Sequence, residues 1–191
     1  MSDPFGSRFD VNQIPLSESS VDDEAGILKS VEQINQLISS EVESGTLPNR
    51  IVLGGFSQGG AMSLFTGLTG ERKLAGVVSL SGWLPLRNKI KSVSTFPKLH
   101  SSMSVTITHC YSHYLQLASP HASSIPVFLG HGSADPIVDP RIAEVSKEFL
   151  TSSLDVPTLG LTYNIYPGMG HSTVPKELDD VIAWIKQVLP A

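Results

Sequence analysis

Several features that define other classes of protein are scarce in this sequence. It has one cysteine, Cys110, so no disulfide can form within the chain, and this is typical of a reducing compartment. Its 13 lysines and arginines are scattered and outnumbered by 18 aspartates and glutamates, which gives a net charge of -5. This charge favours neither nucleic acid nor an anionic membrane as a partner.

Long apolar segments are also lacking. No window reaches the roughly 18 consecutive apolar residues of a membrane span, and the first residues lack the basic and apolar regions of a signal peptide. We therefore expect a cytoplasmic protein without stable membrane insertion. Hydrophobic residues make up 40% of the 191 positions, enough for a packed core, so we expect a single domain over residues 1–191.

Helical periodicity and short apolar runs alternate along the chain. Apolar spacing predicts a helix directly after Ser57 and helices over about 21–44, 140–152 and 175–189. Continuous apolar runs predict strands over 50–56, 74–80, 125–129 and 161–166. Strands that are apolar along their whole length are typical of a parallel sheet covered on both faces. The sequence thus predicts an α/β fold with right-handed crossovers.

Two segments are expected to be irregular. Residues 1–18 are polar and interrupted by proline and glycine. Residues 98–122 are rich in serine and histidine without periodicity, and we interpret them as an insertion. Their histidines and Cys110 match no known metal-site spacing and have no carboxylates near them in sequence, so we expect no metal. At the start of the first predicted helix, Ser20 and Asp23 resemble a capping box.

Gly55-Phe56-Ser57-Gln58-Gly59 joins a predicted strand directly to a predicted helix. Gly-x-Ser-x-Gly in this setting is typical of a nucleophile elbow, a turn so tight that its flanking residues must be small. Gly55, Gly59, Gly60 and Ala61 meet that demand. Ser57 is therefore the candidate nucleophile, and the Gln58 backbone N–H is the candidate donor to an oxyanion. The alternative is a glycine-rich turn with an incidental serine.

A candidate acid and a candidate base follow Ser57 in the order expected for an α/β-hydrolase. Asp135 follows the strand 125–129, and His171 follows the strand 161–166. The carboxyl ends of parallel strands meet at one edge of a sheet, so we expect the three side chains to lie together. His171 would remove the serine proton, and Asp135 would orient the imidazole.

Alternatives for both partners exist nearby. Asp139 is a fallback acid, but Pro140 is expected to start a helix and to make Asp139 its cap. His131 is a possible base, but it precedes the acid and adjoins the strand end, which favours a structural role.

With these residues assigned, the chain resembles the acyl-protein thioesterase/lysophospholipase family of small carboxylesterases. The run Gly54-Gly55-Phe56-Ser57-Gln58-Gly59-Gly60-Ala61 is quite specific to that family. Further matching pieces are Leu80-Ser81-Gly82-Trp83-Leu84-Pro85, Gly130-His131-Gly132 with Asp135-Pro136, and Tyr166-Pro167-Gly168-Met169-Gly170-His171. The resemblance spans about residues 21–97 and 124–189.

The resemblance implies an α/β-hydrolase fold and a Ser57, Asp135 and His171 triad. It also implies hydrolysis of S-acylated proteins or lysophospholipids without a cofactor, in the cytoplasm and also in the nucleus. Trp83 and Leu84 would line the acyl-chain groove, although they could equally be core residues. A peptidase of the same fold is the second interpretation.

Two departures from the family pattern stand out. No His-Gly-x-Gly-Asp motif, which supplies the second oxyanion donor in the family, precedes Ser57. We therefore expect a fold truncated at its N-terminus, with reduced catalysis as the alternative and with strand 50–56 as an open edge that favours a homodimer. The segment 98–122 is the second departure. Together they suggest an alternative or mispredicted gene product, a hypothesis that sequencing the transcript would test.

Overall fold

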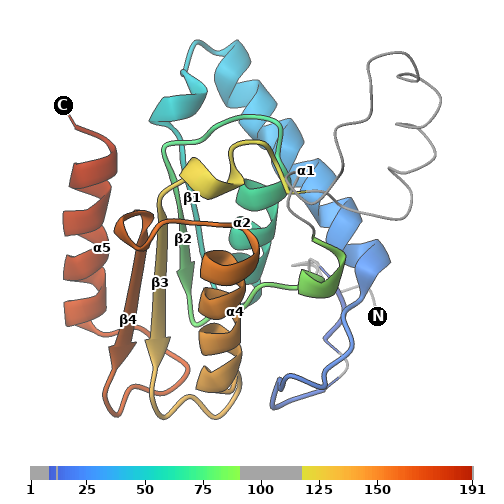
Figure 1. Cartoon of the computed structure of the whole chain (residues 1–191), viewed down its shortest axis with the longest axis vertical. Helices are drawn as coiled ribbons and strands as arrows, with labels where there is room; N and C mark the ends of the chain where they lie inside the picture. The colour runs from blue at the N-terminus through green and yellow to red at the C-terminus, as the bar shows by residue number, and fades with distance from the viewer. Residues whose placement is uncertain (1–8, 12, 91–117, 191) are drawn as a thin grey trace.

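The computed structural model describes residues 9–11, 13–90 and 118–190 (Figure 1). Within them, four parallel strands form one sheet in the order β1-β2-β3-β4. The strands are β1 (Val52–Phe56), β2 (Gly76–Leu80), β3 (Val127–Gly132) and β4 (Leu161–Tyr166). All four correspond to predicted strands, and the parallel pairing confirms the predicted sheet.

Four α-helices accompany the sheet in the described part of the chain. They are α1 (Glu24–Glu43), α2 (Gln58–Thr69), α4 (Pro140–Ser153) and α5 (Pro175–Val188). Short 3-10 helices occupy Pro48–Arg50, Arg87–Lys89, Ala122–Ser124 and Thr158–Gly160. Each predicted helix is therefore present, with ends that differ by a few residues.

The helices cover both faces of the sheet. Buried residues of α1, α2 and α4 share one large apolar cluster with Val77, Val127 and Leu129 of the sheet. On the other face, Trp184 of α5 packs with Val78, Leu80 and Phe128. Figure 1 shows α5 alone on its side of the strands. Successive side chains of β2 and β3 thus point alternately to the two covered faces of the sheet. This explains why both strands are continuously apolar.

β1 lies at one end of the sheet among the described residues and is less buried than the two central strands. Its residues Gly54 and Phe56 are exposed, whereas every residue of β2 and β3 is buried. The expectation that this strand forms an open edge agrees with this arrangement.

Two predicted boundaries are wrong. The third strand does not end at Leu129, because His131 and Gly132 still pair with Ile165 and Tyr166 of β4. The first helix is capped by Asp23 rather than by Ser20: its carboxylate accepts the Gly26 N–H at 3.0 Å. The Ser20 hydroxyl instead accepts the N–H of Ser17, three residues earlier.

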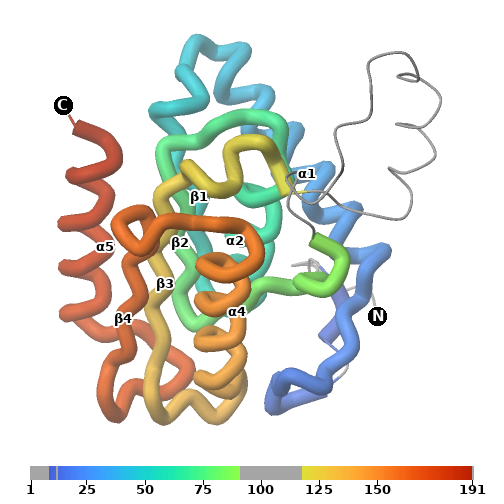
Figure 2. Tube along the Cα trace, viewed as in Figure 1, coloured from blue at the N-terminus to red at the C-terminus, as the bar shows by residue number. Residues whose placement is uncertain are grey.

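The segment before α1 carries no helix among its described residues, in agreement with the prediction, but it is tied to the fold. Leu16 forms an isolated parallel bridge with Val138, and its N–H donates to the Ile137 carbonyl at 2.8 Å. Figure 2 traces this segment from near the N-terminus to α1. Most of the predicted insertion 98–122, including Cys110, lies outside the described residues.

Two features are absent from the described residues. No group of histidine, cysteine, aspartate or glutamate there could hold a metal ion. No helix in the same ranges is long and apolar enough to cross a membrane.

Candidate active site

The candidate nucleophile lies at the junction of β1 and α2. Ser57 has φ 54 and ψ -122, a conformation that L-residues rarely adopt. Its N–H donates to the Leu80 carbonyl at the end of β2, at 2.8 Å, and its own carbonyl accepts the Ala61 N–H. The turn is therefore held from both sides, and its strain is of the kind found at a nucleophile elbow.

The imidazole of His171 joins the other two candidate residues. Its Nε2 lies 2.9 Å from the Ser57 Oγ, and its Nδ1 lies 2.8 Å from Asp135 Oδ2. With Nδ1 donating to the carboxylate, Nε2 is free to accept the serine proton. These three residues are separated by up to 114 positions in sequence, and parallel pairing of β1 to β4 brings them to one edge of the sheet.

Asp135 has few orientations open to it. Its Oδ1 accepts the backbone N–H groups of Ile137 at 2.8 Å and Val138 at 3.0 Å. Its side chain is fully buried, whereas that of His171 is 17% exposed. Hydrogen bonds to both oxygens fix the orientation of this buried side chain.

The loops that carry the acid and the base are tied together directly. Ser133 and Ala134 donate backbone N–H groups to the carbonyls of Tyr166 and Met169, both at 3.0 Å. At Gly132 a Cβ would lie 2.2 Å from the Met169 carbonyl oxygen, so this approach of the two backbones requires glycine. The relative position of Asp135 and His171 thus depends on backbone contacts as well as on their own hydrogen bond.

The need for small residues around the elbow is only partly as predicted. A Cβ at Gly55 would lie 2.3 Å from the Gly59 carbonyl carbon, and one at Gly60 would lie 2.9 Å from the Ser79 hydroxyl. A Cβ on Gly59 itself would meet no atom of the described residues within 4 Å. The prediction that sterics require a small residue at Gly59 is therefore wrong, because that side of the first helical turn faces open space.

Neither the alternative acid, Asp139, nor the alternative base, His131, takes part in the contacts that join Ser57, His171 and Asp135 to one another. Asp139 caps α4 as expected, accepting the Arg141 N–H at 3.0 Å, and Arg141 keeps the pKa of that carboxyl below its usual range. His131 is 1% exposed, and its Nε2 lies 3.0 Å from the Val138 carbonyl oxygen. The same nitrogen lies 3.4 Å from Asp135 Oδ2, so the contacts of His131 are with the loop that carries the acid.

The candidate oxyanion donor, Gln58, is the first residue of α2. Its side chain reaches back to the segment before α1, where Nε2 donates to the Phe9 carbonyl at 2.6 Å. The N-terminal segment is thereby fastened beside the elbow, while the backbone N–H of Gln58 lies at the positive end of the helix.

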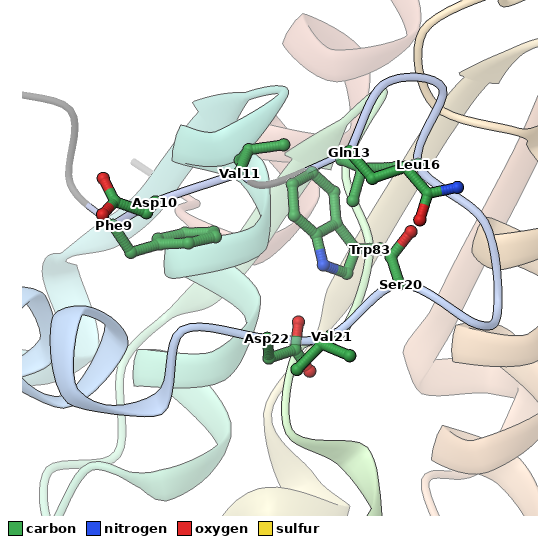
Figure 3. Close-up of a pocket in the computed structure, with 9 residues that line it drawn as sticks. All are labelled: Phe9, Asp10, Val11, Gln13, Leu16, Ser20, Val21, Asp22 and Trp83. Carbon is green, nitrogen blue, oxygen red and sulfur yellow. The ribbon is translucent and has the colours of Figure 1, made fainter.

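Trp83 and Leu84 differ in their surroundings. Trp83 packs edge-on against Phe9 and lines a cavity of about 120 Å³ together with Val11, Leu16 and Val21 (Figure 3). This volume is below the roughly 300 Å³ of most ligand pockets, so it could hold only part of a long acyl chain. Leu84 is completely buried and does not line the cavity, and its N–H donates to the Ser146 hydroxyl at 2.9 Å. Its burial is consistent with the core role that the sequence left open, and its place in an acyl-chain groove stays a prediction.

The burial of one acidic residue, Glu177, was not predicted from the sequence. Glu177, in the first turn of α5, is fully buried, and neither carboxyl oxygen has a hydrogen-bond partner among the described residues. Burial raises the pKa of Glu177 to about 7. A glutamate in a first helical turn usually indicates solvent exposure and a favourable interaction with the helix dipole, so no local signal distinguishes this one.

The chain is similar to known proteins over nearly its whole length. The family model described as phospholipase/carboxylesterase matches residues 7–115 and 112–189. Acyl-protein thioesterase 1 of Cryptococcus neoformans is 40% identical over 96% of this chain and 71% of that protein. Acyl-protein thioesterase 1 of Mycosarcoma maydis is 36% identical over 100% of this chain and 72% of its own length.

Solved structures agree with this relationship. Arabidopsis thaliana SOBER1 has a TM-score of 0.73 and is 30% identical, over 96% of this chain and 74% of that one. Acyl-protein thioesterase 2 of Zea mays has a TM-score of 0.67 and is 30% identical, over 96% and 72%. Both the sequence and the four-stranded parallel sheet with its helices therefore assign the chain to the phospholipase/carboxylesterase family of α/β-hydrolases.

Proposed function

We propose that this chain hydrolyses acyl thioesters and esters with Ser57 as nucleophile, His171 as general base and acid, and Asp135 as orienting acid. The observation that carries the proposal is the imidazole of His171, 2.9 Å from the serine oxygen and 2.8 Å from the carboxylate. The names of the related thioesterases support S-acylated proteins as substrates, and lysophospholipids are the second substrate class.

The reaction follows from these contacts. His171 Nε2 takes the proton of Ser57 as the serine oxygen attacks the acyl carbonyl carbon. The negative charge on the carbonyl oxygen is stabilised by the backbone N–H of Gln58. When the tetrahedral intermediate collapses, the bond to sulfur or oxygen breaks and His171 gives its proton to the leaving thiolate or alkoxide. Water, deprotonated by His171, then attacks the acyl carbon. The bond to Ser57 Oγ breaks, His171 returns the proton to that oxygen, and the fatty acid leaves.

Trp83 contributes to the acyl-chain site in this proposal. Its indole packs against Phe9, and both rings line the cavity beside the N-terminal segment, which also has the polar residues Asp10 and Asp22 in its lining. The two rings give this cavity an apolar side that suits the alkyl chain of an acyl group. We further propose that the protein acts in the cytoplasm, which its single cysteine favours. The sequence resemblance supports action in the nucleus as well. The open edge of the sheet at β1 supports a homodimer.

The first prediction concerns Ser57. We expect Ser57→Ala to abolish both covalent labelling by a fluorophosphonate probe and hydrolysis of a palmitoyl thioester and a short-chain ester. Ser63→Ala is the matched control, because within the described ranges the Ser63 hydroxyl bonds only to the Gly59 carbonyl of its own helix, at 2.8 Å. Residual turnover in Ser57→Ala would contradict the proposed nucleophile. Labelling of the unaltered chain without turnover would instead favour a catalytically impaired form with an incomplete oxyanion site.

A further inference from the structure

Asp135 lies between two imidazoles, and the proposed chemistry uses only one of them. His171 contacts Oδ2 from the solvent-facing side at 2.8 Å. The second imidazole, His131, approaches the same oxygen to 3.4 Å and is 1% exposed. It comes from the penultimate residue of β3, so its backbone is fixed by pairing with Ile165 of β4.

The hydrogen bonds of His131 define its protonation. Its Nε2 lies 3.0 Å from the Val138 carbonyl oxygen, which can only accept, so Nε2 carries the proton. Its Nδ1 is buried without a hydrogen-bond partner among the described residues. A second proton there would be both charged and unpaired, and burial correspondingly lowers the pKa of His131. This ring is therefore neutral in the folded protein.

Val138 links that ring to the acid. The same residue accepts from His131 through its carbonyl and donates its N–H to Asp135 Oδ1 at 3.0 Å. The His131 imidazole, the Val138 backbone and the Asp135 carboxylate thus form a closed set of contacts between the end of β3 and the loop that follows it. Leu16 supports the same loop from outside, through hydrogen bonds to Ile137 and Asp139.

We propose that His131 is a positioning residue for the acid of the triad: its Nε2–H holds Val138 and turns its dipole toward Asp135, which fixes the carboxylate in the plane that His171 requires. This inference rests on the proposed function. His131 touches neither the substrate nor Ser57, so it acts only through Asp135. The charged or titratable groups that face it are Asp135, His171 and Asp139.

The test compares substitutions that keep or remove one N–H. In His131→Gln the amide nitrogen can occupy the place of Nε2, whereas His131→Leu has similar bulk and no donor. We expect His131→Leu to lower kcat per labelled active site roughly tenfold, the upper range for losing a hydrogen bond to a neutral carbonyl such as that of Val138, with KM unchanged. His131→Gln should remain within roughly threefold of the unaltered chain.

The pH profile separates positioning from simple support of the fold. Without the nearby N–H dipole, the carboxylate attracts a protonated His171 more strongly. We therefore expect the acid-side fall of kcat/KM to move to higher pH in His131→Leu and to stay in place in His131→Gln. His121→Leu is the matched control, since the contacts of His121 come from its backbone N–H and carbonyl.

Equal activity per labelled site in the Leu and Gln variants, or an unmoved acid limb, would overturn the proposal. If His131→Leu does not fold, His131→Asn replaces it, because its amide reaches only the Nδ1 position; equal rates for Asn and Gln would then count against positioning. The rate of Ser57 phosphonylation gives the same comparison without turnover. If the unaltered chain shows no turnover, the proposed function fails, and the phosphonylation rates of the His131 variants still decide whether His131 positions Asp135.

Discussion

At the scale of single residues, the Asp135 carboxylate has different partners on its two oxygens. Oδ1 accepts two backbone N–H groups, and Oδ2 accepts from His171. The position of Oδ1 can be occupied only by a hydrogen-bond acceptor such as oxygen, because the two backbone N–H groups there can only donate. The acid is thus distinguished by its surroundings from Asp139, which lies four residues further and caps a helix.

This difference predicts the effect of Asp135→Asn. The amide oxygen must stay at the Oδ1 position, so the amide nitrogen faces His171 Nδ1 and forces the proton onto Nε2. His171 then cannot accept the Ser57 proton, and kcat should fall about 10³–10⁴-fold in an assay of ester hydrolysis. Asp139→Asn is the control and should keep full activity, because asparagine also caps helices. Equal losses in the two variants would argue against Asp135 as the orienting acid.

At the scale of elements, the strand-to-helix junction depends on close backbone approach. Gly55, at the end of β1, lies against the backbone of the first turn of α2, so no side chain can move aside to make room. Gly59 lies within that turn and faces open space among the described residues. Close packing thus requires glycine at position 55, whereas it does not require glycine at position 59 of the same motif.

A pair of alanine substitutions tests this distinction. Gly55→Ala places a methyl group 2.3 Å from the Gly59 carbonyl carbon. It should destabilise the protein by about 2 kcal/mol or more and displace Ser57. Gly59→Ala should leave stability unchanged or raise it by up to about 1 kcal/mol, because alanine favours a helix. Urea unfolding and fluorophosphonate labelling measure both effects. Equal unfolding midpoints would show that the junction tolerates a side chain at either position.

At the scale of the whole molecule, the buried Glu177 links folding to pH. Its carboxyl lies beside Gly130, where an added Cβ would be 2.5 Å from Oε1 and would also approach Leu80 and Phe128. Burial raises the pKa of Glu177 from 4.5 to about 7. The folded state therefore binds this proton more tightly than the unfolded state, and the stabilisation is complete below about pH 4.5 and is lost as the pH rises through 7.

Glu177→Gln should remove this dependence. Near pH 8 the variant should be more stable than the unaltered chain by up to about 3 kcal/mol, since each pKa unit corresponds to about 1.4 kcal/mol. Near pH 4 the two should unfold at similar urea concentrations, because both side chains are then neutral. Urea unfolding across pH 4–8 gives the comparison. A variant less stable than the unaltered chain at pH 8 would mean that the ionised carboxylate is stabilised in the fold.

The sequence by itself determined the elements and their order. Apolar runs such as 74–80 had to be buried on both faces, which only a covered parallel sheet allows, and a glycine-flanked Ser57 between strand and helix indicated the elbow. The strand ends before Asp135 and His171 placed both residues at one sheet edge. These signals are local, because each depends on a few adjacent residues.

Contacts between distant segments were decided only by the tertiary structure. β3 extends through His131 because it pairs with β4. Asp23 rather than Ser20 caps α1 because of the path that the chain takes before this helix. Likewise the burial of Glu177 and Leu84 and the second imidazole beside Asp135 have no local signal. Burial depends on which elements pack together, and hydrogen-bond geometry depends on distances that only the folded chain sets, so residue spacing could nominate Ser57, Asp135 and His171 but not their arrangement.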